Sequence, residues 1–127
     1  MTFPLASARA SRFEWLPTVG STNTELLRRV NSEPIADWPH LAVLATDDQT
    51  AGKGRLGRDW SAPAGSSLAI SVLVRPTTPS GRPLSPEALG WFGLLAGLAM
   101  TRACNQVVGV NEAALKWPND VLIEGRK

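Results

Sequence analysis

Several residue types that support specialised folds or chemistry are scarce in this chain of 127 residues. It has one cysteine, Cys104, which excludes an internal disulfide framework and fits a reducing compartment such as the cytoplasm. Because Cys104 lies at the end of an apolar stretch, we interpret it as a small core residue. The one histidine, His40, follows a proline in an expected loop, which favours a solvated role over catalysis.

Net charge and long apolar runs are equally modest. The formal net charge is +2, so no field over the whole surface indicates binding to DNA. Residues 1–10 lack a basic region followed by an apolar stretch, so we expect no signal peptide. The apolar run at 88–104 is interrupted by Arg102 and is shorter than the roughly 20 residues that span a bilayer. We therefore expect a buried helix there and no membrane partner.

The apolar pattern predicts a mixture of helices and strands. Residues 68–74 form a near-continuous apolar run rich in β-branched residues, which predicts a central strand covered on both faces. Ser85 and Pro86 begin an apolar helix that we expect to reach about residue 105, with glycines along one side for close packing. Further strands are predicted at 13–16, 41–46, 114–117 and from 121, and residues 1–12 are expected to form a loose arm.

One stretch, residues 46–60, combines glycines with cations between two apolar runs. Three glycines and three cations, Lys53, Arg55 and Arg58, lie within seven residues. Glycines let the backbone come close to a ligand, and cations beside free N–H groups suit phosphate or carboxylate. Such a loop contributes little to a core, so its composition indicates a small anionic or nucleotide ligand.

Other interpretations of this loop are available. Gly52, Gly54 and Gly57 match the dinucleotide-binding string, but that site needs a helix directly afterwards, whereas a turn and a strand are expected here. Binding of a nucleic-acid backbone is opposed by the small number of basic residues and the lack of a recognition helix. A purely structural glycine loop is the third alternative.

Two shorter motifs accompany the loop. Thr22 with Glu25 three positions later fits a helix-capping box, and the helix is expected to bury Leu26, Leu27 and Val30. This helix start either caps the helix alone or also presents N–H groups and hydroxyls to a polar ligand.

The second motif begins at Lys116, which ends an apolar strand before a Trp-Pro-Asn-Asp turn. Lys116 is either held at a cleft or an ordinary strand-end lysine. Asn119 and Asp120 are most simply turn-forming residues.

Together these motifs resemble the catalytic domain of biotin protein ligases (biotin–[acetyl-CoA-carboxylase] ligases). That family carries a Ser-Thr-Asn helix start, a Gln-x-x-Gly-Arg/Lys-Gly-Arg-x-Gly-Arg loop closely followed by Trp, and Lys-Trp-Pro-Asn-Asp. This chain has them in the same order at 21–23, 49–60 and 116–120. The resemblance covers residues 15–127, after an arm at 1–14. It implies an α+β fold of the class II aminoacyl-tRNA synthetase and biotin ligase type, a mixed sheet with packed helices.

The resemblance also implies a two-step reaction with ATP and Mg²⁺. Biotin and ATP form biotinyl-5′-AMP, and one lysine of a biotin carboxyl carrier domain then attacks this anhydride. Carried over by position, the biotin-binding residues are Ser21, Thr22, Asn23, Gln49, Gly52, Lys53, Gly54, Arg55 and Lys116. The residues that bind ATP or the adenylate are Arg55, Arg58, Trp60 and Lys116, of which Lys116 and Arg55 act in catalysis. The metal ligands stay undefined.

The chain departs from the family pattern in two respects. Lys53 stands where many members have Arg, which keeps the charge but loses the planar fork. Members continue after Arg126 and Lys127 with further strands, further ligand contacts and a small β-barrel, so we expect about half of a catalytic domain. No winged-helix DNA-binding domain fits before Trp15, so we expect the single-function type.

The alternatives to a biotin ligase are a lipoate–protein ligase, whose loop usually reads Arg-Arg-x-Ser-Gly-Gly-Gly, and a non-catalytic ligand-binding fragment.

Overall fold

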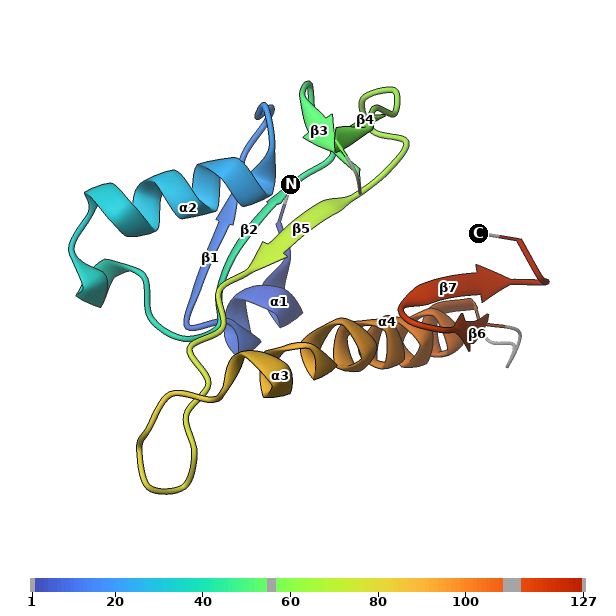
Figure 1. Cartoon of the computed structure of the whole chain (residues 1–127). Coiled ribbons are helices and arrows are strands. Elements are labelled where there is room, and N and C mark those ends of the chain that lie inside the picture. Colours follow the sequence, from blue (N-terminus) through green and yellow to red (C-terminus); the bar gives the residue numbers. More distant parts are fainter. Residues whose placement is uncertain (1, 55–56, 109–112, 127) are drawn as a thin grey trace. The chain divides into compact units, whose positions relative to one another are not determined.

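The computed structural model describes residues 2–54, 57–108 and 113–126 and divides into two compact units (Figure 1). Unit 1 is Met1–Pro76 and unit 2 is Thr77–Lys127. Both units mix helices with strands, which confirms the predicted α+β class.

Unit 1 contains a three-stranded sheet in the order β1-β2-β5. Strand β1 (Arg12–Trp15) runs parallel to β2 (Ala42–Thr46), and β2 runs antiparallel to β5 (Ala69–Val72). The strands predicted at 13–16 and 41–46 are confirmed, and β2 supplies most of the buried core.

The predicted central position of the strand at 68–74 is wrong. In the described residues β5 lies at the edge of the sheet, with Ile70 and Val72 exposed by 44% and 48%. An unbroken apolar run shows that both faces of a strand are apolar, but it does not show how many neighbouring strands it has. Buried Ser71 shows that one face of β5 is covered.

Helices lie on both faces of this sheet. Helix α2 (Thr22–Ser32) packs on the face that carries Leu44 and Ser71. Helix α1 (Pro4–Arg9) lies on the other face, beside Val43 and Val72. The register pairs Leu44 with Ser71 and Val43 with Val72, and successive side chains of a strand point to opposite faces.

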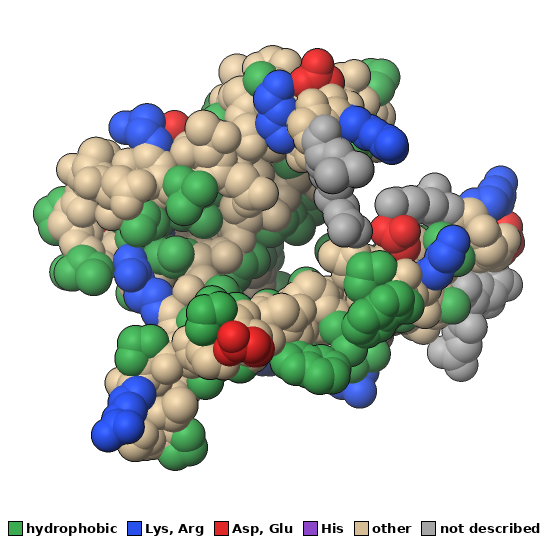
Figure 2. All heavy atoms as spheres, in the orientation of Figure 1, with side chains coloured by type: hydrophobic (Ala, Val, Ile, Leu, Met, Phe, Trp, Pro, Cys, Tyr) green, Lys and Arg blue, Asp and Glu red, His purple; other side chains and the backbone are tan. Residues whose placement is uncertain are grey.

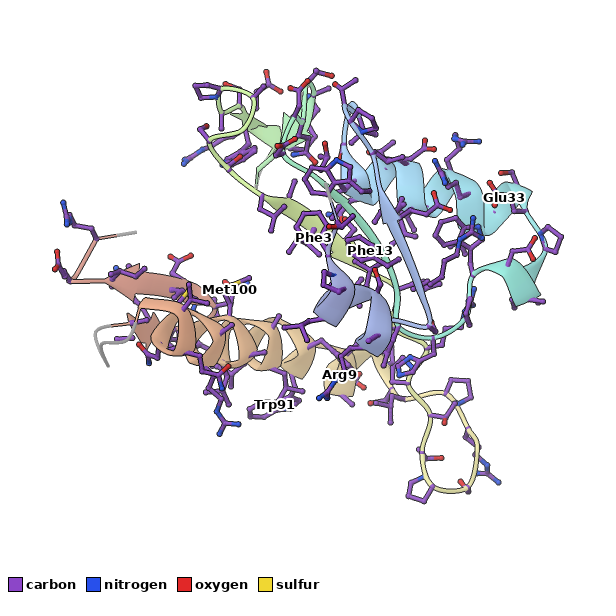
Figure 3. All side chains as sticks on the ribbon, turned by 180° about the vertical axis from the view of Figure 1, so that it is seen from behind. Phe3, Arg9, Phe13, Glu33, Trp91 and Met100 are labelled. Carbon is purple, nitrogen blue, oxygen red and sulfur yellow. The ribbon has the colours of Figure 1, made fainter. Side chains whose placement is uncertain are left out.

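Two expectations about these helices fail. Residues 4–9 form α1 where a loose arm is expected, and the ring of Phe3 lies 5.5 Å from that of Phe13 (Figure 3). So short a helix has no readable periodicity, and aromatic packing holds it in place. In α2, Leu26 is buried as predicted, whereas Leu27 is 61% exposed because neighbouring positions point about 100° apart on a helix.

The loop after α2 holds an unexpected core residue. It contains the short helix η1 (Ile35–Asp37), and the next residue, Trp38, is fully buried. Trp38 Nε1 donates to Glu33 Oε2 at 2.7 Å, and the guanidinium of Arg12 lies 4.0 Å above its ring. The loop expected before His40 therefore also contributes a residue to the core.

An ion-pair network joins α2 to β1. Glu25 accepts hydrogen bonds from Arg28 and Arg29, and Arg29 also reaches Glu14 on β1. The hydrogen bond from Arg28, followed by that from Arg29, lowers the pKa of Glu25 from 4.5 to about 2. Burial raises the pKa of Glu14, but its hydrogen bonds from Arg12 and Arg29 outweigh this and the net shift is downward.

Unit 2 consists of helices α3 (Pro86–Leu89) and α4 (Trp91–Val108) and a hairpin of β6 (Ala113–Lys116) and β7 (Asp120–Ile123). Ser85 caps α3 as predicted, accepting from Ala88 N at 3.3 Å. The single predicted helix is divided at Gly90. Both hairpin strands and the intervening turn are confirmed.

Close packing along the glycines of α4 is confirmed at Gly97. A Cβ added there would lie 2.6 Å from Leu115 Cδ1 on β6, so glycine allows this approach. The expectation that this helix is buried is wrong elsewhere along α4, because Trp91 and Met100, which point to opposite sides of the helix, are exposed by 62% and 48% (Figure 3). Within the described ranges, no helix combines the length and apolarity needed to cross a bilayer.

We predict that Leu44→Ala lowers the free energy of unfolding by about 2–5 kcal/mol, because it leaves a cavity in the core of unit 1. Leu44 is fully buried, whereas Leu27 is 61% exposed, so Leu27→Ala is a matched control that changes stability by less than about 0.5 kcal/mol. Urea unfolding of the two variants measures the difference. Equal losses would show that β2 is not the core of this unit.

The low pKa of Glu25 predicts acid sensitivity. A carboxylate with a lower pKa in the folded state stabilises the fold above its unfolded pKa, and that stability is lost as the pH falls through about 2. We expect Glu25→Gln to lose less stability than the unsubstituted chain between pH 6 and pH 2.5, in urea unfolding at both pH values. Glu124→Gln, at an exposed carboxylate, is the control. Parallel losses in all three proteins would contradict the role of Glu25.

Candidate functional site

The start of α2 and the glycine-rich loop are held side by side in unit 1. Thr50 N donates to Val19 O at 2.9 Å, and Ala51 N donates to Gly20 O at 2.7 Å. These bonds continue the parallel pairing of β1 and β2 beyond the strands. As a result, Ser21 enters the helix next to Gln49.

The side chain of Gln49 binds a backbone N–H group at the start of α2. Its Oε1 accepts from Thr22 N at 2.9 Å and lies 3.3 Å from Thr22 Oγ1. The first N–H groups of a helix have no partner within the helix, so a side chain from the loop satisfies one of them. Ser21 is the N-cap residue and accepts from Thr24 N, so the predicted capping box of Thr22 and Glu25 is wrong.

A third segment joins this arrangement from β5. Ser71 is buried, its Oγ lies 2.8 Å from Thr22 Oγ1, and it donates to Asn23 Oδ1. Ser71 is not among the site residues predicted from the sequence. The available signal is a single hydroxyl within an otherwise apolar strand, and the strand register is needed to interpret it.

These elements surround a pocket of about 300 Å³. Six predicted site residues line it, namely Ser21, Thr22, Asn23, Gln49, Lys53 and Trp60. Four lining residues that the sequence analysis missed come from β5 and the residue before it, namely Leu68, Ala69, Ile70 and Ser71. The helix start and the glycine loop therefore line one pocket in unit 1.

The glycine loop itself is a small hairpin of β3 (Gly52–Lys53) and β4 (Asp59–Trp60). A strand therefore follows the glycines, as the sequence predicts, and the helix required by a dinucleotide site is absent from the described part of the loop. A Cβ at Gly52 would lie 2.5 Å from Gln49 Nε2 and 2.6 Å from Trp60 O. Glycine is therefore the residue that lets the hairpin close against Gln49.

Lys53 has an intramolecular partner. Its Nζ donates to Asp59 Oδ1 at 2.6 Å across the hairpin. The hydrogen bond from Lys53 lowers the pKa of Asp59, so this carboxylate is ionised at neutral pH. Asp59 is not among the site residues predicted from the sequence.

Gly52, Gly54 and Arg58 are not among the described residues that line this pocket. Gly54 N donates to Arg58 O at 2.7 Å and closes the hairpin. Arg55 lies outside the described residues. Lys116 is exposed and ends β6 in unit 2.

A protein-built metal cage is not evident in the described ranges. They contain no cluster of three or more His, Cys, Asp or Glu side chains that could hold a metal ion.

Comparisons with known proteins assign this chain to a family. The sequence profile of the biotin/lipoate A/B protein ligase family matches residues 15–127. The chain is 42% identical over 110 residues to the biotin–[acetyl-CoA-carboxylase] ligase of Mycobacterium tuberculosis, and 37% identical over 113 residues to that of Paracoccus denitrificans. These matches cover 85% and 88% of this chain.

The fold agrees with this assignment. The biotin protein ligase of Leishmania major in complex with biotinyl-5-AMP superposes with a TM-score of 0.67 at 26% identity, over 92% of this chain. The chain belongs to the biotin/lipoate A/B protein ligase family. It spans 38% and 42% of the two relatives' lengths and 49% of the Leishmania chain.

We predict that Gly52→Ala lowers the free energy of unfolding by about 1–3 kcal/mol, because the new methyl group meets the backbone of Trp60. Gly20→Ala is the control, since the nearest atom to its Cβ is 3.8 Å away, and it changes stability by less than about 1 kcal/mol. Urea unfolding measures both. A Gly52 variant as stable as the control would show that the hairpin is not closed against Gln49.

Proposed function

We propose that this chain supplies the biotin-binding part of a biotin–[acetyl-CoA-carboxylase] ligase. The observation that carries the proposal is the pocket in which the Ser21–Thr22–Asn23 helix start, Gln49 and the hairpin come together. It lies in a chain that is 42% identical to the M. tuberculosis enzyme of that name.

The chemistry of the pocket suits biotin. A ureido group needs both donors and acceptors, which the hydroxyls of Ser21 and Thr22 and the amide of Asn23 provide. Ile70 and Trp60 offer apolar surface to the thioether ring, and Lys53 offers a positive charge to the carboxylate. A volume of about 300 Å³ is at the lower end of the usual range for ligand pockets.

The first proposed step is adenylation. A carboxylate oxygen of biotin attacks the α-phosphorus of ATP, the bond to the bridging oxygen breaks, and pyrophosphate leaves with that oxygen. Carboxylate and triphosphate repel each other, so cations that hold both lower the barrier by positioning and by stabilising charge. We assign Lys53, Gly54 and Arg55 to the adenylate linkage, Arg58 to phosphate, Trp60 to the adenine, and Lys116 to the carboxylate and α-phosphate.

The second proposed step is transfer to protein. The neutral amine of one lysine in a biotin carboxyl carrier domain attacks the carbonyl carbon of biotinyl-5′-AMP. An amide bond forms, AMP leaves, and the amine loses its proton. Because the anhydride hydrolyses readily, a loop that folds over it protects it from water. We place this reaction in the cytoplasm, without a DNA or membrane partner.

The lipoate alternative is not favoured, because the relatives cited above are named as biotin ligases. The decisive experiment incubates the whole gene product with ATP, Mg²⁺, labelled biotin and a carrier domain. Label on the carrier lysine is expected, with little transfer of lipoate under the same conditions. No biotin transfer, or equal transfer of both acids, would overturn the proposal.

We predict that Lys116→Ala and Arg55→Ala in the whole gene product each reduce the rate of biotin-dependent ATP–pyrophosphate exchange by about 10²–10³-fold. Each substitution removes a cationic side chain that we propose stabilises the negative charge of the transition state. Arg126→Ala is the control for loss of a cation, because Arg126 is exposed and pairs with Glu124, and it keeps its exchange rate. A near-normal rate in either test variant would remove that residue from the proposed site.

A further inference from the structure

A lysine and an aspartate face each other across the β3–β4 hairpin at the pocket. Lys53 and Asp59 are directly paired in the antiparallel register, and Lys53 Nζ donates to Asp59 Oδ1 at 2.6 Å. Figure 2 shows basic and acidic side chains next to each other over this hairpin. Of the lining residues that the structure describes, Lys53 is the charged one. The positive charge that the pocket offers to a ligand is therefore shared with a carboxylate.

The pair is easily disturbed by a ligand. The side chains of Lys53 and Asp59 are 63% and 85% exposed, so water screens their attraction. Exposed ion pairs of this kind change an equilibrium constant by about one- to fivefold. The lysine can thus turn a second N–H group toward a ligand without a large loss, but the negative charge of Asp59 stays within a few ångströms.

We propose that Asp59 is a specificity-determining residue that acts through Lys53. It offsets the lysine charge and so reduces the preference of the pocket for a carboxylate over the uncharged form of the same ligand. The inference rests on the proposed biotin-binding function. A carboxylate held less tightly in the ground state also needs less energy to leave its ion pair and attack phosphorus, which favours turnover over tight binding.

The test compares biotin with biotin amide, which lacks the negative charge, by calorimetric titration of the whole gene product. Asp59→Asn keeps the size and an acceptor oxygen but removes the charge. We expect it to tighten biotin binding two- to fivefold and to leave biotin amide unchanged. The gain shrinks between 50 mM and 500 mM NaCl, because salt screens exposed charges. Glu124→Gln, which removes a carboxylate in unit 2, changes neither affinity.

A double-substitution cycle tests whether Asp59 acts through Lys53. Lys53→Ala weakens biotin binding, and adding Asp59→Asn to that variant then changes the biotin affinity by less than twofold. A gain of the same size in the Lys53→Ala background would show that Asp59 acts independently of the lysine.

The outcomes separate this inference from the function on which it rests. If the unsubstituted protein binds biotin but Asp59→Asn leaves its affinity unchanged, or alters biotin and biotin amide equally, the inference is wrong and the function stands. If Asp59→Asn alters the affinity for AMP instead, Asp59 belongs to phosphate binding and the inference is also wrong. If the unsubstituted protein binds neither biotin nor its amide, the proposed function itself fails.

Discussion

The hydrogen bond from Thr22 N to Gln49 Oε1 is the contact on which the pocket of unit 1 depends. It joins two segments that are 27 residues apart and satisfies a helix-terminal N–H that would otherwise need water. Because the same amide group lies against Gly52, the hairpin closes on the helix start through one side chain. The shape of the pocket and the hydrogen bonding of the helix N-terminus therefore both depend on the side-chain amide of Gln49.

The core and the ion-pair network of unit 1 hold α2 and the sheet in the positions that this contact needs. Leu44 and Trp38 fill the core, and the Glu25–Arg29–Glu14 chain of hydrogen bonds ties α2 to β1. Buried apolar packing supplies the stability, while the charged network fixes how α2 lies along the sheet. A rigid helix start is what a polar ligand requires, since its donors and acceptors must be aligned before it binds.

The sequence predicts the polar half of the pocket well. Short motifs identify Asn23, Gln49 and Lys53 because the chemistry needs those residue types in a loop or at a helix terminus, and such signals are local. The contributions of Ser71 and Asp59 depend on strand register, which brings together residues that are far apart in the sequence or separated by a turn. The local sequence around either residue does not show which residue it faces.

Errors in the fold prediction have a similar origin. Trp38 lies between two prolines, directly after the short helix η1. It is buried against Arg12 and Glu33, and sequence spacing does not reveal these contacts. Strand β5 has the composition of a central strand, yet in the described sheet it pairs with one strand, β2. The motif at Lys116 lies in a different unit, so the role proposed for Lys116 is based on the resemblance to the family and not on an observed contact.

The closed packing at Gly52 has a consequence for redesign of this protein. Because a Cβ at Gly52 has no room, the shape of the pocket at this one position cannot be altered by substitution. Leu68 and Ile70 also line the pocket, and both are half exposed, so their side chains can be varied. Libraries that vary these two positions sample new pocket shapes while the polar anchor stays intact.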